Sequence, residues 1–157
     1  MIKFVIPYTN YMGVKKEKEC RFNMTRSECV DLDLEYEEYG GLKNYLQGLM
    51  KNYSGKDKEE FDKMPKKPII DFFKMLVDRS YGILSEDGDL FRKKNSEGVP
   101  YINDFRDSPA YSEFVYGLLD GTYDIEEFVK GALPYVSDEA IQKARAELQT
   151  NNVTPIN

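Results

Sequence analysis

Two groups of acidic side chains are the residues whose types and spacing come closest to a chemical site. The first group holds five carboxylates within one short stretch: Asp31, Asp33, Glu35, Glu37 and Glu38. Carboxylates gathered in this way can hold a divalent cation. A run of like charges is more often a solvated segment than a metal site. We therefore interpret the stretch as a solvated acidic connector that follows a short helix.

The second group is the run Ser-Glu-Asp-Gly-Asp at residues 85–89. It is similar to a fragment of a calcium-binding loop. It lacks both the regularly spaced ligands and the distal bidentate glutamate of an EF-hand. A plain turn is the favoured interpretation.

Residues able to perform catalysis are scarce. The chain has no histidine, which removes the commonest general base and the commonest metal ligand. Cys20 and Cys29 are its two cysteines, and their spacing is not that of a zinc or redox motif. We predict that both are small core residues, with a disulfide or a nucleophile as the alternatives. No phosphate-binding loop, dinucleotide-binding glycine pattern or nucleophile elbow occurs. We predict no catalytic residue, no cofactor and no metal.

Composition favours a soluble globular protein. The 157 residues are 41% hydrophobic and 32% charged, with a net charge of −6. The lysines are scattered, which argues against nucleic acid as a ligand, because neutralising phosphates requires massed positive charge. No apolar run approaches the roughly 20 residues of a membrane span. The first eight residues lack the small-residue cleavage site of a signal peptide, so we expect a cytosolic protein without a membrane partner.

One helix over residues 68–82 is expected to organise the fold. Its apolar residues recur at helical spacing: Ile69, Phe72, Phe73 and Leu76. Pro68 suits the first helical position, and Gly82 suits the left-handed residue that ends a helix. Because apolar residues cover several sides, we predict a core helix surrounded by other helices.

The remaining elements are read from local patterns. Alternation in 2–6 and 20–24 predicts a β-hairpin, with Asn10 and Gly13 for the reversal and a charged run for solvent. Thr25 and Glu28 form a capping box at the start of a short helix. Further helices are expected over 42–53 and from Ser108, Asp124 and Ser137, with a polar linker over 54–67 and a loop or small hairpin after Gly82.

The predicted fold class is mainly α (α+β). A single helical domain with a short N-terminal β-hairpin is expected over residues 1–149, followed by a flexible C-terminal tail over 150–157.

Short runs spread over residues 1–135 resemble a known family. In chain order they are 8–13, 21–25, 38–42, 69–74, 80–82, 85–88, 110–114 and 127–134. They are similar to the tail assembly chaperones of long-tailed (siphovirus-type) phages and prophages of Gram-positive bacteria. The chain departs from the family pattern in an insert around 54–67 and in 99–105.

The resemblance implies a non-enzymatic protein of the host bacterial cytoplasm. It would bind the tape measure protein, keep it soluble while tail tube subunits polymerise, and be absent from the mature virion. The tail tube protein is a further implied partner, and we expect weak homo-oligomers. A structural tail or connector subunit that stays in the particle is the alternative. An acidic inhibitor that mimics nucleic acid is disfavoured by the scattered lysines.

The partner-binding surface is expected on the helices spanning 108–133. The predicted residues are Tyr111, Phe114, Val115, Tyr116, Leu118 and Phe128. Tyr116 falls off the main apolar stripe and is expected to face outward. Gly121 and Pro134 are expected to separate these helices from the central helix and leave a groove edge available.

Overall fold

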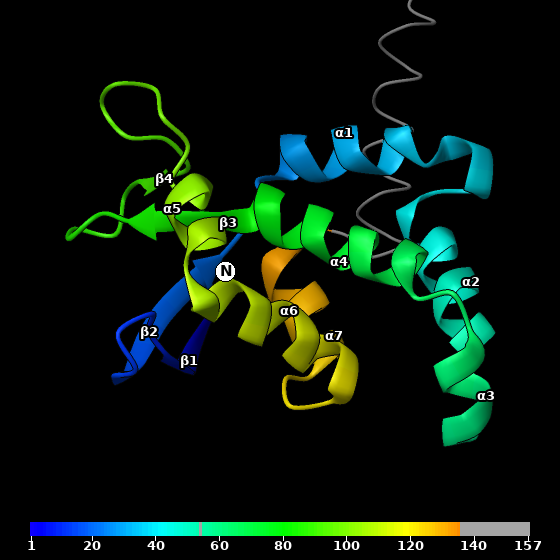
Figure 1. Cartoon of the computed structure of the whole chain (residues 1–157). Coiled ribbons are helices and arrows are strands. Elements are labelled where there is room, and N and C mark those ends of the chain that lie inside the picture. The colour runs from blue at the N-terminus through cyan, green and yellow to red at the C-terminus, as the bar shows by residue number, and fades with distance from the viewer. Residues whose placement is uncertain (54, 136–157) are drawn as a thin grey trace, which may run out of the picture. The chain divides into compact units, whose positions relative to one another are not determined.

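The computed structural model describes residues 1–53 and 55–135. Over these residues the chain is mainly helical with one small antiparallel sheet, which confirms the predicted α+β class (Figure 1). The strands are β1 Ile2–Thr9, β2 Lys15–Phe22, β3 Tyr81–Leu84 and β4 Phe91–Arg92. The helices are α1 Arg26–Glu35, the 3-10 helix η1 Glu37–Tyr39, α2 Leu42–Tyr53, α3 Lys58–Lys63, α4 Lys67–Ser80, α5 Ile102–Asp107, α6 Pro109–Asp120 and α7 Ile125–Ala132.

The chain forms two compact units. Among the described residues, the sheet unit consists of Met1–Met24 and Pro65–Ala132, and the helical unit consists of Thr25–Met64 and 133–135. The single domain expected over 1–149 stays a prediction. The helix expected from Ser137 and the tail over 150–157 lie outside the described residues.

The sheet has the strand order β1-β2-β3-β4, and all neighbours are antiparallel. The predicted N-terminal hairpin is confirmed, with Phe4 opposite Cys20 and Ile2 opposite Phe22. Each of its strands has eight residues, so the hairpin is longer than the alternation in 2–6 indicated. The segment after the central helix is a second, smaller hairpin of β3 and β4.

Aromatic rings fill the core of the sheet unit. Phe22 stacks on Phe114 with their ring centroids 4.8 Å apart, and Phe128 lies 5.4 Å from each of them. Phe4 joins the cluster at 5.1 Å from Phe114. The rings come from β1, β2, α6 and α7, so burial of this one cluster holds the helices on the hairpin.

The central helix α4 is confirmed as a core helix. Six of its residues are buried: Ile69, Phe72, Phe73, Leu76, Val77 and Ser80. Within the sheet unit, α4 packs against both α6 and β2, so a strand as well as a helix covers it. The expectation that α6 stands apart from the central helix is therefore wrong.

Gly82 does not end α4 in the left-handed conformation, as had been expected. The helix ends at Ser80, and Gly82 lies in β3. A Cβ atom at this position would approach the Phe91 ring to 2.7 Å and the Arg92 carbonyl oxygen to 2.8 Å. The glycine is thus needed for the close approach of β4 and not for a helix cap.

The helical unit begins at the predicted capping box. Thr25 Oγ1 accepts a hydrogen bond from the Glu28 N–H, and the Glu28 side chain accepts one from the Thr25 N–H. The helix that follows is not short, because α1 continues through Asp31 and Asp33 to Glu35. The expected polar linker over 54–67 contains α3, which Asp57 caps by accepting from the Glu60 N–H.

Asp33 corrects the interpretation of the acidic stretch as a solvated connector. Its side chain is 2% exposed, and its Oδ1 accepts a hydrogen bond of 2.8 Å from the Leu42 N–H at the start of α2. This carboxylate therefore ties α2 to α1, next to the positive end of the α2 dipole.

We expect Asp33→Ala to lower the free energy of unfolding by about 1–3 kcal/mol, because it leaves the Leu42 N–H buried without its acceptor. Asp33→Asn is the matched control, since it keeps an acceptor oxygen at this position and should cost less. Urea denaturation measures the loss of unfolding free energy in each variant and shows whether Asp33→Ala loses more than Asp33→Asn. A loss in Asp33→Ala no larger than in Asp33→Asn would contradict the role of Oδ1.

Candidate functional site

The six residues predicted to bind a partner occupy two very different environments. Tyr111 is 8% exposed, whereas Tyr116 is 51% exposed. The other four are fully buried: Phe114, Val115, Leu118 and Phe128. The apolar stripe of α6 faces β1, α4 and α5, so the protein's own core covers it. Partner binding by this set stays a prediction, and Tyr116 is the member whose side chain offers surface, as expected from its position off the stripe.

Tyr111 also has a structural partner. Its hydroxyl donates a hydrogen bond of 2.9 Å to Asp78 Oδ1 in α4, and Arg106 of α5 forms an ion pair with Asp78 Oδ2. Burial, and then the hydrogen bond to Asp78, raise the pKa of Tyr111 well above its usual value. The three side chains join α4, α5 and α6, which assigns Tyr111 to the internal architecture of the sheet unit.

The turn between β1 and β2 exposes apolar side chains on a fixed backbone. Tyr11 is 82% exposed, Met12 86% and Val14 51%. Asn10 Oδ1 accepts hydrogen bonds from the backbone N–H groups of Met12 and Val14, at 3.0 and 2.9 Å. Gly13 supplies the left-handed residue of the turn, with φ of 79°. We call residues 11–16, which include Lys15 and Lys16, the hairpin tip.

The hairpin tip is also tied to the rest of the sheet unit. The Tyr11 hydroxyl donates a hydrogen bond of 3.0 Å to the carbonyl oxygen of Asp107 at the end of α5. The sequence interpretation assigned Asn10 and Gly13 to the reversal and the charged run to solvent, and it did not identify an exposed apolar surface at this turn. The sequence does contain a sign of this surface: apolar residues in a tight turn between Asn10 and Gly13 cannot reach a core and must be exposed.

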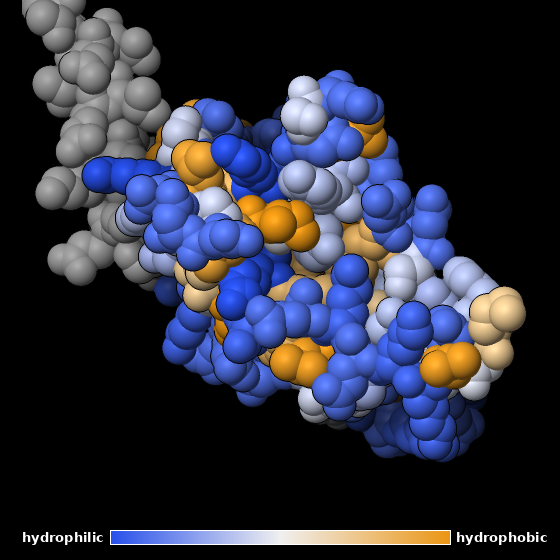
Figure 2. All heavy atoms as spheres, turned by 90° about the vertical axis from the view of Figure 1, so that its left-hand side faces the viewer, coloured by the Kyte–Doolittle hydropathy of each residue, from blue (hydrophilic) through white to orange (hydrophobic). Residues whose placement is uncertain are grey.

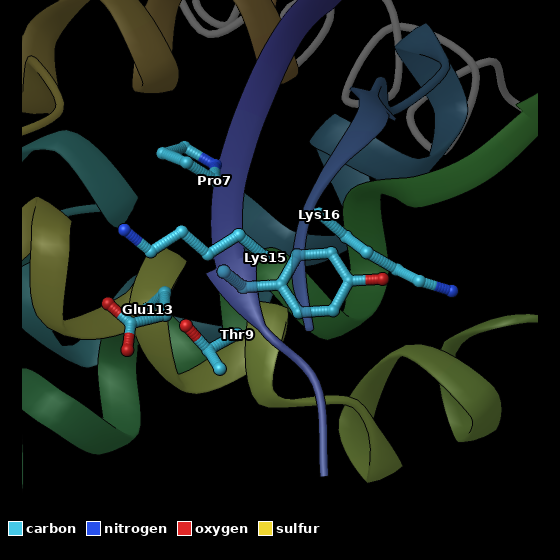
Figure 3. A pocket seen from close by; sticks show the side chains of 6 residues that line it. Pro7, Thr9, Lys15, Lys16 and Glu113 are labelled. Carbon is cyan, nitrogen blue, oxygen red and sulfur yellow. The ribbon is translucent and has the colours of Figure 1, made fainter. Parts of the chain in front are cut away.

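A pocket lies beside the hairpin tip. It has a volume of about 280 Å³ and is lined by Pro7, Tyr8, Thr9, Lys15, Lys16 and Glu113. Figure 3 shows Thr9 and the extended side chain of Lys15 on the same side of the strand as Glu113 of α6. These side chains include both signs of charge but no activated nucleophile. The pocket suits contact with a side chain of another protein better than it suits catalysis.

The helical unit carries a second exposed surface, along α1 and η1. We call its residues the acidic patch: Asp31, Leu34, Glu37, Glu38 and Tyr39. Leu34 is 39% exposed and Tyr39 is 57% exposed. The ring of Tyr39 lies 4.8 Å from that of Tyr45, which holds the exposed tyrosine in place.

Both cysteines are buried free thiols, which confirms their predicted role as core residues. Burial raises the pKa of the Cys20 thiol from 9.0 to about 12, so the thiol is neutral at ordinary pH. Within 1–53 and 55–135, no group of three or more Cys, Asp or Glu side chains is placed to hold a metal ion.

One face of the protein shows how some of its exposed apolar side chains are distributed. On the face shown in Figure 2, apolar areas are small and are separated by polar residues. A single large apolar patch is therefore not the feature of this face that a partner would recognise. None of the helices in the described part of the chain has the length and apolar character to span a membrane.

One known family matches the sequence over nearly its whole length. The match covers residues 1–155, and the family is described as phage tail assembly chaperone. Comparisons with curated proteins and with solved structures found no match. The matched residues include those that form the hairpin tip, the pocket and the acidic patch. The chain belongs to the family of phage tail assembly chaperones.

Proposed function

We propose that the protein binds the tape measure protein during tail morphogenesis, keeps it soluble, and is absent from the mature virion. The observation that carries this proposal is the family match over residues 1–155. We place the activity in the cytoplasm of the bacterial host, as part of a long-tailed (siphovirus-type) phage or prophage of Gram-positive bacteria. The chain acts by binding and not as an enzyme.

The client surface is proposed on the exposed side of α6. Glu113 and Tyr116 are three residues apart in this helix, so their side chains lie on the same side, and Glu113 also lines the pocket. Tyrosine combines a large apolar ring with a polar end, which suits a contact that must form and later release. The apolar face of a client helix can pack against such a surface.

Each copy can bind the client weakly, because many copies acting together on one long client can still keep it soluble. Each copy that covers a few hundred Å² of apolar client surface gains roughly 25 cal/mol per Å² removed from water. When several copies bind neighbouring sites on one client, the effective concentration of each copy rises and the overall binding becomes tighter. Weak self-association of the chaperone would strengthen this effect. The tail tube protein is the other proposed partner, since the client has to stay soluble while tube subunits polymerise.

Co-expression tests the chaperone proposal. We expect the tape measure protein to move from the pellet to the supernatant when this chain is co-expressed, and the two proteins to co-purify. A client that stays insoluble, or that is soluble without this chain, would overturn the proposal. Mass spectrometry of purified particles tests the alternative, since a stoichiometric amount of this chain in the particle would indicate a retained structural subunit.

A further inference from the structure

Charge is distributed unevenly along this acidic chain. Residues 1–24 contain five of its 22 Lys and Arg residues but only two of its 28 Asp and Glu residues. Residues 28–38 contain six Asp or Glu residues and no Lys or Arg. The first segment forms the β1–β2 hairpin, and the second forms most of α1 and leads into η1. The β1–β2 hairpin is therefore basic for so acidic a chain, and the segment of α1 and η1 is acidic.

The hairpin tip offers cations next to exposed apolar groups. Lys15 and Lys16 are exposed and form no ion pair with any residue that the structure describes. Tyr11, Met12 and Val14 precede them on the same turn, and the hydrogen bonds to Asn10 Oδ1 fix the backbone. Because the turn is already ordered, binding through it requires little loss of conformational entropy.

The acidic patch offers the complementary groups. Glu37 and Glu38 are exposed carboxylates, and Leu34 and Tyr39 supply apolar and aromatic surface beside them. Lysine ammonium groups are attracted both to carboxylates and to the faces of tyrosine rings. Apolar groups flanked by positive charge on one surface thus match apolar groups flanked by negative charge on the other.

We propose that the hairpin tip of one copy docks on the acidic patch of a second copy. The two surfaces are different, so the contact is heterologous and produces either a closed ring or an open chain with a free tip at one end and a free patch at the other. We expect a contact between one turn and five patch residues to bury less than the roughly 1,200 Å² of total area that stable complexes need, so the assembly is weak and reversible. The inference rests on the self-association included in the proposed function and names the contact that produces it.

A charge exchange tests the contact on the full-length protein. One variant carries Lys15→Glu with Lys16→Glu, and the second carries Glu37→Lys with Glu38→Lys. Each variant presents like charges to its own copies, so we expect its self-association to weaken by about tenfold or more. An equimolar mixture of the two restores opposite charges at both contacts and should associate again. Lys56→Glu with Lys58→Glu is the control for the first variant, because it makes the same change in net charge at exposed positions elsewhere.

Sedimentation velocity over a concentration series gives the readout, at about 0.05 M and about 0.5 M salt. The wild type and the control should associate at low salt and dissociate at high salt, because the higher salt concentration screens exposed charges. Circular dichroism checks that every variant is folded. If the wild type associates and the tip variant associates equally well, the contact is wrong while self-association stands. If the wild type is monomeric at every concentration, both are wrong, and the solubility of the co-expressed client still reports separately on the chaperone proposal.

Discussion

Replacing Phe114 by Ala should lower the free energy of unfolding by about 3–5 kcal/mol. The side chain is fully buried and stacks on Phe22, with its ring 5.1 Å from Phe4 and 5.4 Å from Phe128. Truncation removes the ring that links α6 to both strands of the hairpin, and it leaves a cavity that several other rings can fill only in part. Urea denaturation followed by circular dichroism measures the loss.

Tyr116→Ala is the matched control in the same helix. Because Tyr116 is 51% exposed, its truncation should change the free energy of unfolding by no more than about 0.5 kcal/mol. It should nevertheless reduce the amount of tape measure protein that co-purifies with the chain, since the ring belongs to the proposed client surface. Equal destabilisation by the two variants would mean that the assignment of Phe114 to the core and Tyr116 to the surface is wrong.

Elements whose signals are local could be predicted from the sequence. The alternation around Phe4 and Phe22 indicates strands, and the capping box of Thr25 and Glu28 involves residues only three apart. Ser108 likewise caps α6 by accepting a hydrogen bond from the Ala110 N–H. In each case the residues that determine the element are close together in the chain, so their spacing alone carries the information.

The role of the apolar stripe on α6 could not be predicted in the same way. Periodicity identifies which side of a helix is apolar, but a face that binds a partner and a face that packs on the protein's own core have the same pattern. The structure decides between them for Phe114 because residues far away in the chain, such as Phe4 and Phe22, cover its ring. The sequence gives no direct sign of that contact.

The roles of Gly82 and Asp33 also depend on contacts that local sequence patterns do not reveal. A glycine after a helix suits a left-handed cap, yet Gly82 is required by Phe91, a residue of another strand. A run of carboxylates predicts a solvent-exposed segment. Asp33 is buried nevertheless, because its side chain accepts a hydrogen bond from the Leu42 N–H. Both roles depend on partners about nine residues away whose positions are fixed only by the folded chain.

Alkaline pH should destabilise the protein in two steps. Burial raises the pKa of Cys20 from 9.0 to about 12 and that of Tyr81 from 10.0 to about 12, and it raises the pKa of Tyr111 as well. Each group stays protonated in the folded state while it ionises in the unfolded chain. The unfolded state then binds fewer protons, so stability falls as pH rises above the unfolded pKa. The stability that each group contributes is fully present below its unfolded pKa.

The first step belongs to Cys20 and begins near pH 9.0, and the tyrosines add to it above pH 10.0. Each group contributes a slope of about 1.4 kcal/mol per pH unit until the pH reaches its folded pKa. Urea denaturation at pH 8, 9 and 10 covers the first step, because the unfolded pKa of Cys20 lies below that of the tyrosines. Cys20→Ala is the control: it removes the thiol, so the loss between pH 9 and pH 10 should shrink by about 1 kcal/mol relative to the wild type. An identical pH dependence of wild type and Cys20→Ala would show that the buried Cys20 thiol is not responsible for the loss.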